Sequence, residues 1–322
     1  MPCTALLHGL WQTSWTRVAP DKAVEMMYKV WAAGFTTFDA ADHYGPAEDL
    51  LGLLHERLRR EKGSGYKLQA FTKWCPRPGV ITRAAVDQAV STSLRRMKVD
   101  CLDSLQFHWW DYSMHAEMMN ALTFLNESRK AGRINQLALT NFDTKTLQQI
   151  LAAGIPISSN QVQYSLIDMR PAKKMTPLCL QHGVKLLTYG TLAGGLLSDK
   201  WLGRPEPCSK ADIPTPSLGK YFNMIKAWGS WALFQELLVA CRIVADRHGV
   251  GIAHVAIRWV LDQPAVAGVI VGLHAGISEH AEDNKRVFGF ALTEDDKQGL
   301  QAVLGRGRDL LSTIGDCGDE YR

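Results

Sequence analysis

Short runs of apolar and β-branched residues alternate along this 322-residue chain with longer segments in which apolar residues recur every three or four positions. The short runs are typical of buried strands, and the longer segments of helices with one buried face. The runs predict strands at residues 3–8, 36–38, 68–72, 102–107, 134–139, 157–159, 184–188 and 266–271. The segments predict helices at residues 22–33, 47–60, 83–97, 115–131, 144–151, 172–182, 231–248 and 252–261.

This alternation predicts the fold class. Strands separated by helices at this spacing are typical of a parallel sheet, and eight such units close into a (β/α)8 TIM barrel of the α/β class. Local signals agree, because Thr82 is a suitable N-cap for helix 83–97, and Gly34 and Gly132 stand where helix C-terminal glycines belong. One face of helix 83–97 carries Val86, Val90, Ser93, Leu94 and Met97.

The chain is expected to form one domain over residues 1–322. Its hydrophobic content of 46% is ample for a large core, and no Pro/Gly/Ser-rich linker divides it. The proline-rich stretch 202–215 is expected to be a long loop. It lies between the seventh and eighth strands together with the helices at 231–248 and 252–261, so this strand–helix unit is enlarged.

Charge and cysteine content narrow the class of partner. The net charge of +4 is small and spread along the chain, and no apolar run is long enough to cross a membrane, so we expect neither a nucleic-acid nor a membrane partner. The N-terminus has no basic-then-apolar signal region. The seven cysteines include no C-x-x-C spacing, so we expect free thiols in a cytoplasmic protein and no metal site.

Four titratable residues of different types follow successive predicted strands. Asp39 and Tyr44 follow the strand at 36–38, while Lys73 and His108 follow the next two. The carboxyl ends of all strands lie on one face of a parallel barrel, so these side chains should converge at a proton-transfer site. Lys73 beside Tyr44 would stabilise the phenolate and lower the pKa of the phenol, and Asp39 would keep Lys73 charged.

Each of these residues alone has a more ordinary role. An Asp after a strand is commonly a cap, a loop Tyr packs, and a strand-end Lys or His is commonly a solvated or hydrogen-bonded group. The functional interpretation therefore depends on their succession at neighbouring strand ends. Asp42 and His43, between Asp39 and Tyr44, are expected to be loop structure.

Longer segments around these residues resemble the motifs of the aldo-keto reductase family. Residues 34–45 resemble its Asp/Tyr signature, 72–74 its lysine segment and 105–109 its histidine segment. Its cofactor-binding strand ends are similar to residues 140–142, 160–161, 189–200, 269–272 and 280–284. The resemblance covers about the whole chain. It implies a (β/α)8 barrel that reduces carbonyl groups with a nicotinamide cofactor, usually NADPH, and no G-x-G-x-x-G motif follows a strand here.

The resemblance also implies residue roles. Tyr44 would be the proton donor, supported by Lys73 and Asp39, and His108 would place the substrate oxygen. The expected cofactor-binding residues are Asn141, Gln161, Tyr189, Gly190, Thr191, Leu192, Gly194, Lys200, Gly272, His274 and Asn284. Four tryptophans that follow strands, namely Trp11, Trp74, Trp109 and Trp110, are expected to bind a flat apolar or aromatic carbonyl substrate. The alternative is that two or more of them simply pack the top of the barrel.

The sequence departs from the family at the last strand. Relatives that prefer NADPH often carry Arg two residues after the glycine, where this chain has His274. Arginine grips a phosphate bidentately and histidine does not. NADP(H) is still expected over NAD(H), with Lys200, Lys285 or Arg286 as alternative phosphate ligands. Little sequence precedes the first strand, so the hairpin that usually closes the barrel bottom is expected to be absent.

Three functions stay open at this point. The first is an NAD(P)H-dependent oxidoreductase that reduces an aldehyde or ketone to an alcohol. The second is a cofactor-sensing binding subunit on the same fold with little turnover, although a pure binder need not keep all four titratable residues. The third is an aldolase that uses Lys73 as a Schiff base, against which Tyr44 and residues 189–200 argue. The natural substrate and the oligomeric state are not encoded in any recognisable pattern.

Overall fold

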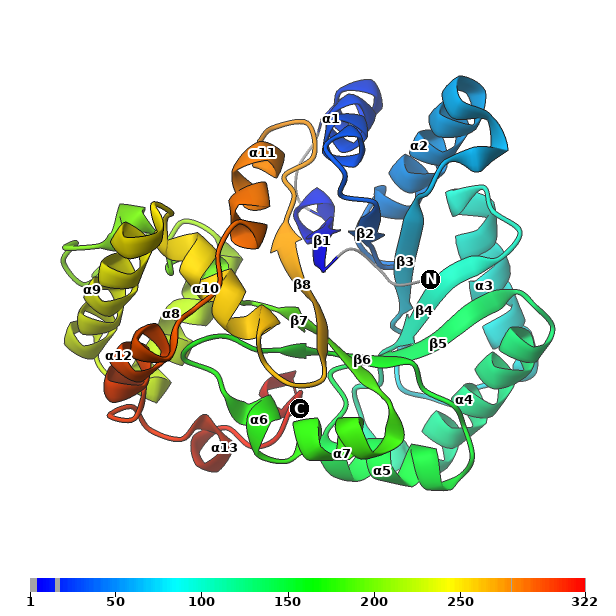
Figure 1. The fold of residues 1–322 in the computed structure, drawn as a ribbon. Helices are drawn as coiled ribbons and strands as arrows, with labels where there is room; N and C mark the ends of the chain where they lie inside the picture. Colours follow the sequence, from blue (N-terminus) through cyan, green and yellow to red (C-terminus); the bar gives the residue numbers. More distant parts are fainter. Residues whose placement is uncertain (1–4, 15–17, 279, 322) are drawn as a thin grey trace.

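The computed structural model describes residues 5–14, 18–278 and 280–321, and within them eight parallel strands close into a barrel in chain order (Figure 1). This confirms the predicted (β/α)8 fold. The strands are β1 (Leu6–Gly9), β2 (Thr37–Asp39), β3 (Gln69–Trp74), β4 (Leu102–Phe107), β5 (Ile134–Thr140), β6 (Ser159–Gln163), β7 (Lys185–Tyr189) and β8 (Val266–Gly272). Cys3 and Thr4, at the start of the first predicted strand, and the segment on which the hairpin expectation depends lie outside the described residues.

Helices surround the barrel and alternate with its strands (Figure 1). Between β1 and β7 they are α1 (Pro20–Ala32), α2 (Ala47–Lys62), α3 (Arg83–Met97), α4 (His115–Lys130), α5 (Thr144–Ala152), α6 (Arg170–Lys173) and α7 (Met175–His182). The predicted helix 172–182 is thus two short helices. The cap predictions are confirmed: Ala85 N–H donates to Thr82 Oγ1 over 3.2 Å, and Gly34 and Gly132 adopt positive φ after their helices.

The unit between β7 and β8 is enlarged, as predicted. It contains α8 (Pro216–Trp228), α9 (Trp231–His248) and α10 (Ile252–Leu261), which form the yellow-green lobe of Figure 1. Helix α8 is not among the predicted helices. It begins with Pro216 in its first turn, and Thr215 Oγ1 accepts the Leu218 N–H over 3.2 Å. The prolines that mark the preceding loop therefore also mark the start of this helix.

After β8 the chain forms α11 (Ala281–Asn284), α12 (Glu294–Leu304) and α13 (Leu310–Thr313). It then returns toward the barrel, and the C-terminus lies near α6 (Figure 1). No helix in the described part of the chain is long and apolar enough to cross a membrane.

Two layers of side chains fill the barrel interior. Leu7, Phe71 and Leu187 form a small apolar cluster inside it. Strand side chains alternate between the two faces of a sheet, so Lys73 lies two residues beyond Phe71 on the same inner face. The interior consequently changes from apolar to polar toward the carboxyl ends of the strands, where the buried groups include Asp39, Lys73 and Gln161.

Candidate functional site

A cavity of about 590 Å³ opens where the strands end. This size is ordinary for a small-molecule site. The cavity is lined by all four titratable residues singled out in the sequence, Asp39, Tyr44, Lys73 and His108. The convergence expected from the strand-end spacing is therefore present in the structure, although the chemical role of each residue stays a prediction.

Lys73 and Asp39 form a buried ion pair at the floor of the cavity. Lys73 Nζ donates to Asp39 Oδ2 and, over 2.9 Å, to the Ala40 carbonyl oxygen. The other carboxylate oxygen of Asp39 accepts from Gln106 Nε2 at 2.7 Å and from Gln161 Nε2 at 2.9 Å. Breaking such a buried pair leaves an uncompensated charge, so this network fixes the Lys73 ammonium in place.

The pair keeps Lys73 protonated. Burial has the largest single effect and lowers the pKa of the Lys73 amine, but the charges of Asp39 and Tyr44 and the hydrogen bond to Asp39 together outweigh it, and the net pKa lies above its usual value. A Schiff-base lysine must be a neutral amine. The environment of Lys73 therefore argues against the aldolase hypothesis.

Tyr44 differs from expectation in one respect. Lys73 Nζ lies 4.8 Å from the centre of its ring and lowers the pKa of the phenol, as expected. Burial has the opposite and larger effect, the charge of Asp39 adds to it, and the pKa of Tyr44 is raised to about 12. The predicted lowering by Lys73 is therefore present but does not decide the net pKa, because desolvation penalises the phenolate more strongly. The phenol carries its proton throughout the neutral range.

His108 stands at the side of the cavity with an aromatic neighbour on its face. Its ring lies 4.0 Å from that of Trp110 at an interplanar angle of 34°, and its Nδ1 is 3.9 Å from Cys75 Sγ. The Tyr321 ring meets it edge-on at 6.1 Å. These contacts restrict the orientation of the imidazole in the wall of the cavity that Tyr44 also lines.

Most of the predicted cofactor residues also line the cavity. They are Asn141, Gln161, Tyr189, Gly190, Thr191, Leu192, Gly194 and Gly272. The Tyr189 hydroxyl donates to Asn141 Oδ1 over 2.8 Å. Gly194 has a φ of 67°, and a Cβ there would lie 2.9 Å from Ser217 Oγ, so only glycine keeps the backbone this close to α8.

Lys200, His274 and Asn284 do not line the cavity, in contrast to the prediction. The Lys200 side chain is exposed to solvent, and Asn284 is the last residue of the short helix α11. His274 lies in the loop after β8, where its backbone pairs with Ser278. Its Nε2 atom is buried with no hydrogen-bond partner among the described groups, so the ring is turned into the protein.

Two of the alternative phosphate ligands, Lys285 and Arg286, already form ion pairs. Lys285 Nζ lies 2.8 Å from Glu282, and Arg286 Nη1 lies 3.3 Å from Asp283. These pairs are largely exposed, and such pairs contribute little stability. Both cations can therefore exchange their partner for a phosphate.

Two of the four tryptophans predicted to bind the substrate, Trp11 and Trp110, lie in the cavity wall, and Trp74 and Trp109 do not. Trp11 and Trp110 line the cavity and are 39% and 36% exposed. Trp74 and Trp109 pack instead on Phe107, with ring centres 5.5 and 5.9 Å away. Each follows an inward-pointing residue, and alternation sends it to the opposite side of the barrel wall.

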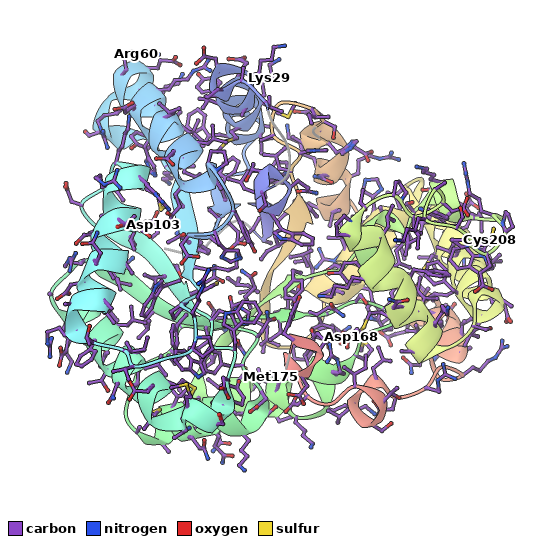
Figure 2. The ribbon with its side chains drawn as sticks, turned by 180° about the vertical axis from the view of Figure 1, so that it is seen from behind. Lys29, Arg60, Asp103, Asp168, Met175 and Cys208 are labelled. Atoms are coloured by element: carbon purple, nitrogen blue, oxygen red, sulfur yellow. The ribbon has the colours of Figure 1, made fainter. Side chains whose placement is uncertain are left out.

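The C-terminal segment supplies residues that the sequence analysis missed. Tyr321 lines the cavity, and its hydroxyl accepts from Lys220 Nζ and is hydrogen-bonded to the Tyr189 hydroxyl over 3.1 Å. Glu320 binds Arg170 over 2.8 Å, and the guanidinium of Arg170 also binds both carboxylate oxygens of Asp168 at 2.8 Å. Figure 2 shows Asp168 beside this returning segment, drawn in pink.

Comparison with known proteins identifies one family. The model of the aldo/keto reductase family matches residues 5–304. Flagellar radial spoke protein 5 of Chlamydomonas reinhardtii is 28% identical over 260 residues, covering 69% of this chain but 49% of that protein, so the chain spans about half of its length. Chloroplastic pyridoxal reductase of Arabidopsis thaliana is 27% identical over 83% of this chain and 72% of its own. An aldo-keto reductase of Klebsiella pneumoniae in complex with NADPH shares the fold, with a TM-score of 0.69 and 20% identity over 94% of this chain and 91% of that one.

Proposed function

Because the chain belongs to the aldo/keto reductase family, we propose that it reduces an aldehyde or ketone to an alcohol with NAD(P)H, and that Tyr44 donates the proton. The observation that carries this proposal is the position of Tyr44, whose ring lies 4.8 Å from a buried ammonium in the cavity wall. An ordinary packing role for Tyr44 does not account for a charged Lys73 kept beside it by Asp39.

Each residue of the site has a separate role in the proposed carbonyl reduction. A bound nicotinamide supplies the hydride. Tyr44 holds its proton at neutral pH and passes it to the substrate oxygen as negative charge develops there. The Lys73 ammonium then stabilises the phenolate left behind, since an adjacent positive charge favours the charged form of a phenol. His108 orients the substrate oxygen from the opposite side, in the place fixed by Trp110.

The cavity wall suits a nicotinamide cofactor. Tyr189 offers an aromatic ring for stacking, and Asn141 beside it offers an amide that can pair with a carboxamide. Gly194, with its positive φ, lets backbone N–H groups approach a pyrophosphate. NADP(H) is proposed over NAD(H), with Lys285 and Arg286 as the exposed cations that replace the missing arginine.

The proposed substrate class is a flat aromatic aldehyde. Trp11 and Trp110 border the cavity, and Tyr321 closes it from the C-terminal segment. Aromatic side chains favour stacked aromatic ligands. The similarity to a pyridoxal reductase agrees with this class, so pyridoxal is a suitable member of a substrate panel beside benzaldehyde and a short aliphatic aldehyde.

The test is stoichiometric turnover. Purified protein is first titrated with NADPH and NADH by quenching of tryptophan fluorescence. The aldehyde panel is then assayed for cofactor oxidation and alcohol formation. One alcohol formed per NADPH oxidised, with aromatic aldehydes preferred, supports the proposal. Tight cofactor binding without turnover of any aldehyde would favour the binding-subunit alternative, and a borohydride-trapped adduct on Lys73 would favour an aldolase.

A further inference from the structure

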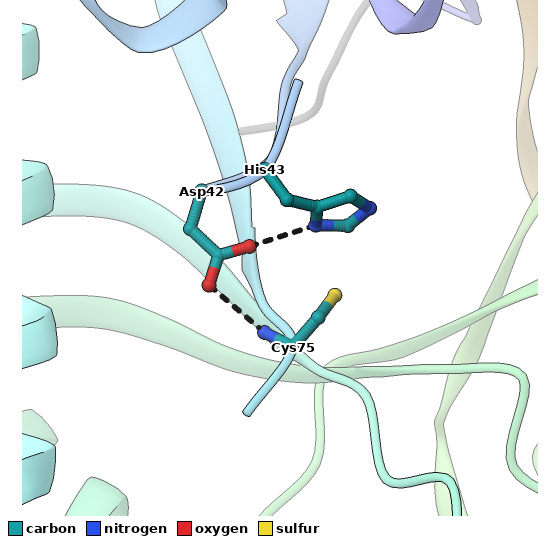
Figure 3. A group of neighbouring side chains, drawn as sticks. All are labelled: Asp42, His43 and Cys75. Atoms are coloured by element: carbon teal, nitrogen blue, oxygen red, sulfur yellow. Dashed lines mark hydrogen bonds and ion pairs between the residues drawn. The ribbon is translucent and has the colours of Figure 1, made fainter. Parts of the chain in front are cut away.

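Three side chains with metal-ligand atoms meet at the edge of the cavity. A carboxylate oxygen of Asp42, a ring nitrogen of His43 and Cys75 Sγ all lie within 4.8 Å of one another (Figure 3). His43 and Cys75 are among the residues that line the cavity. The catalytic scheme proposed above uses none of these three side chains.

Hydrogen bonds between the ends of β2 and β3 hold the group together. Asp42 N–H donates to the Lys73 carbonyl oxygen over 3.0 Å, and Cys75 N–H donates to Asp42 Oδ2 over 3.1 Å. Asp42 Oδ1 is 2.8 Å from His43 Nδ1, which orients the imidazole. The two strands pair in parallel, with Asp39 opposite Phe71. The three ligand atoms are therefore arranged before any ion arrives.

We propose that Asp42, His43 and Cys75 form a binding site for a thiophilic divalent cation, Zn²⁺ or Cd²⁺, at the mouth of the cavity. One thiolate, one imidazole and one carboxylate are a typical zinc ligand set, and three protein ligands leave a fourth position open to water or substrate. Mg²⁺ and Ca²⁺ prefer all-oxygen ligands, so this set discriminates against them. Asp42 and Cys75 are 33 positions apart in the sequence, so the spacing of ligands along the chain could not reveal the site. The proposed site replaces the expectation that the protein has no metal site.

The proton and charge balance of binding is simple. The Cys75 thiol loses its proton to solvent, and its sulfur forms the bond to the cation. Asp42 Oδ2 keeps its hydrogen bond from the Cys75 N–H, and Oδ1 exchanges its contact with His43 Nδ1 for the metal ion. The charges of a divalent ion, a thiolate and a carboxylate cancel. The free site carries the single negative charge of the Asp42 carboxylate, so exchange of the thiol proton for a divalent ion raises the net charge of the site by one, to zero.

The Cys75 thiol reacts poorly with oxidants, so oxidation competes little with metal binding. Burial raises the pKa of Cys75, and the charge of Asp42 raises it further. Thiolate, and not thiol, is the species that oxidants and alkylating reagents attack. A metal ion overcomes this penalty because its bond to sulfur replaces the proton.

Occupancy would block the proposed reductase site. Cys75 Sγ lies 3.9 Å from His108 Nδ1, and the His43 ring meets that of Tyr44 edge-on at 4.8 Å. An ion bound to Cys75 and His43 thus stands beside both groups proposed to bind the substrate oxygen. Metal inhibition rests on the proposed function, whereas metal binding does not.

The experiment measures binding and inhibition separately. The metal-free full-length chain is titrated with Zn²⁺ by calorimetry in two buffers of different protonation enthalpy. We expect one ion per chain and release of a proton from Cys75. Cys75→Ser should abolish this proton release and weaken binding by at least the ~10–100-fold that loss of an outer-shell partner of a metal ligand typically costs. His43→Gln should also weaken binding, and it should fold normally because the His43 side chain is 51% exposed.

Cys101→Ser and Cys208→Ser are the matched controls, because both thiols are exposed and neither lines the cavity. They should bind Zn²⁺ like the wild type. Zn²⁺ should inhibit aldehyde reduction by the wild type, and EDTA should restore it. The proposal is overturned if Cys75→Ser binds Zn²⁺ as the wild type does, or if a thiol reductant but not EDTA reverses the inhibition. Cys75-dependent binding in a chain that reduces no aldehyde would uphold the metal site and reject the reductase function.

Discussion

The hydroxyls of Tyr189 and Tyr321 are hydrogen-bonded to each other over 3.1 Å, and this contact joins the end of β7 to the last described residue of the chain. Lys220 Nζ lies 4.4 Å from the centre of the Tyr321 ring and donates to its hydroxyl. The C-terminal segment is therefore part of the cavity wall. It touches the ring proposed to stack on the nicotinamide, so its anchoring should influence ligand binding.

Because the Glu320–Arg170 ion pair holds the C-terminal segment at the cavity, we expect Glu320→Gln to change the kinetics. This change removes the ion pair to Arg170 but leaves Arg170 bound to Asp168. A hydrogen bond between charged groups contributes about 1.5–3 kcal/mol, so we expect KM for an aromatic aldehyde to rise roughly tenfold with a smaller change in kcat. Steady-state kinetics and limited proteolysis of the C-terminus check this. Glu294→Gln, which breaks an exposed pair with Lys297, is the control, and an equal rise of KM in both variants would contradict the expectation.

Arg170 predicts a large effect on stability. Its side chain is fully buried and pairs with the equally buried Asp168. Arg170→Met leaves that carboxylate without its counter-charge, which costs about 3–5 kcal/mol of unfolding free energy. Arg306→Met breaks an exposed pair with Glu236 and should cost about 0–1 kcal/mol. Guanidinium unfolding of both variants gives the comparison, and similar losses in the two would show that the buried pair is not critical.

Asp296 predicts how stability depends on pH. Burial raises the pKa of this carboxyl, but hydrogen bonds from His248, Thr293 and Arg247 lower it more, to about 2 from 3.8. A folded-state pKa below the unfolded value stabilises the protein above pH of about 4, and this stabilisation disappears as pH falls through about 2. The unfolding free energy of the wild type should therefore decline more steeply from pH 4 to pH 2 than that of Asp296→Asn. Parallel curves for the two proteins would refute the assignment.

His274 predicts an engineered change of cofactor preference. Arginine can bind a phosphate through two hydrogen bonds, and charge-assisted bonds are roughly twice as strong as neutral ones. The loop of His274 follows Gly272, which lines the cavity. We expect His274→Arg to lower the Kd for NADPH and leave that for NADH unchanged. His274→Gln is the uncharged control. No change in selectivity with either variant would show that Lys285, Arg286 or backbone groups bind the phosphate.

The sequence predicted the parts of the site that depend on topology. Lys73 and His108 each follow a strand, and a parallel barrel brings strand ends together whatever the remaining sequence is. The positions of Trp74 and Trp109 away from the cavity could also have been inferred from the sequence. In a strand, side chains alternate between the two faces, so a residue next to an inward-pointing one lies on the outer face. Gln106 could have been found in the same way, two residues before His108 on β4.

Other features had no local signal. Arg170 and Glu320 lie 150 positions apart, and Tyr321 reaches the cavity only because α13 and the residues after it fold back to α6. The pKa of Tyr44 also escaped prediction. Its direction depends on the balance between burial and the charge of Lys73, and burial is a property of the assembled cavity.

The most direct test of the central claim is the rate of the chemical step in Tyr44→Phe. The phenylalanine keeps the ring and removes only the proton donor. At saturating NADPH and aromatic aldehyde, the single-turnover rate of cofactor oxidation should fall about 10²–10⁴-fold, the usual contribution of a general acid, while the Kd for NADPH stays close to the wild-type value. A Tyr44→Phe protein that turns over at a near-wild-type rate would contradict the assignment of Tyr44 as the proton donor.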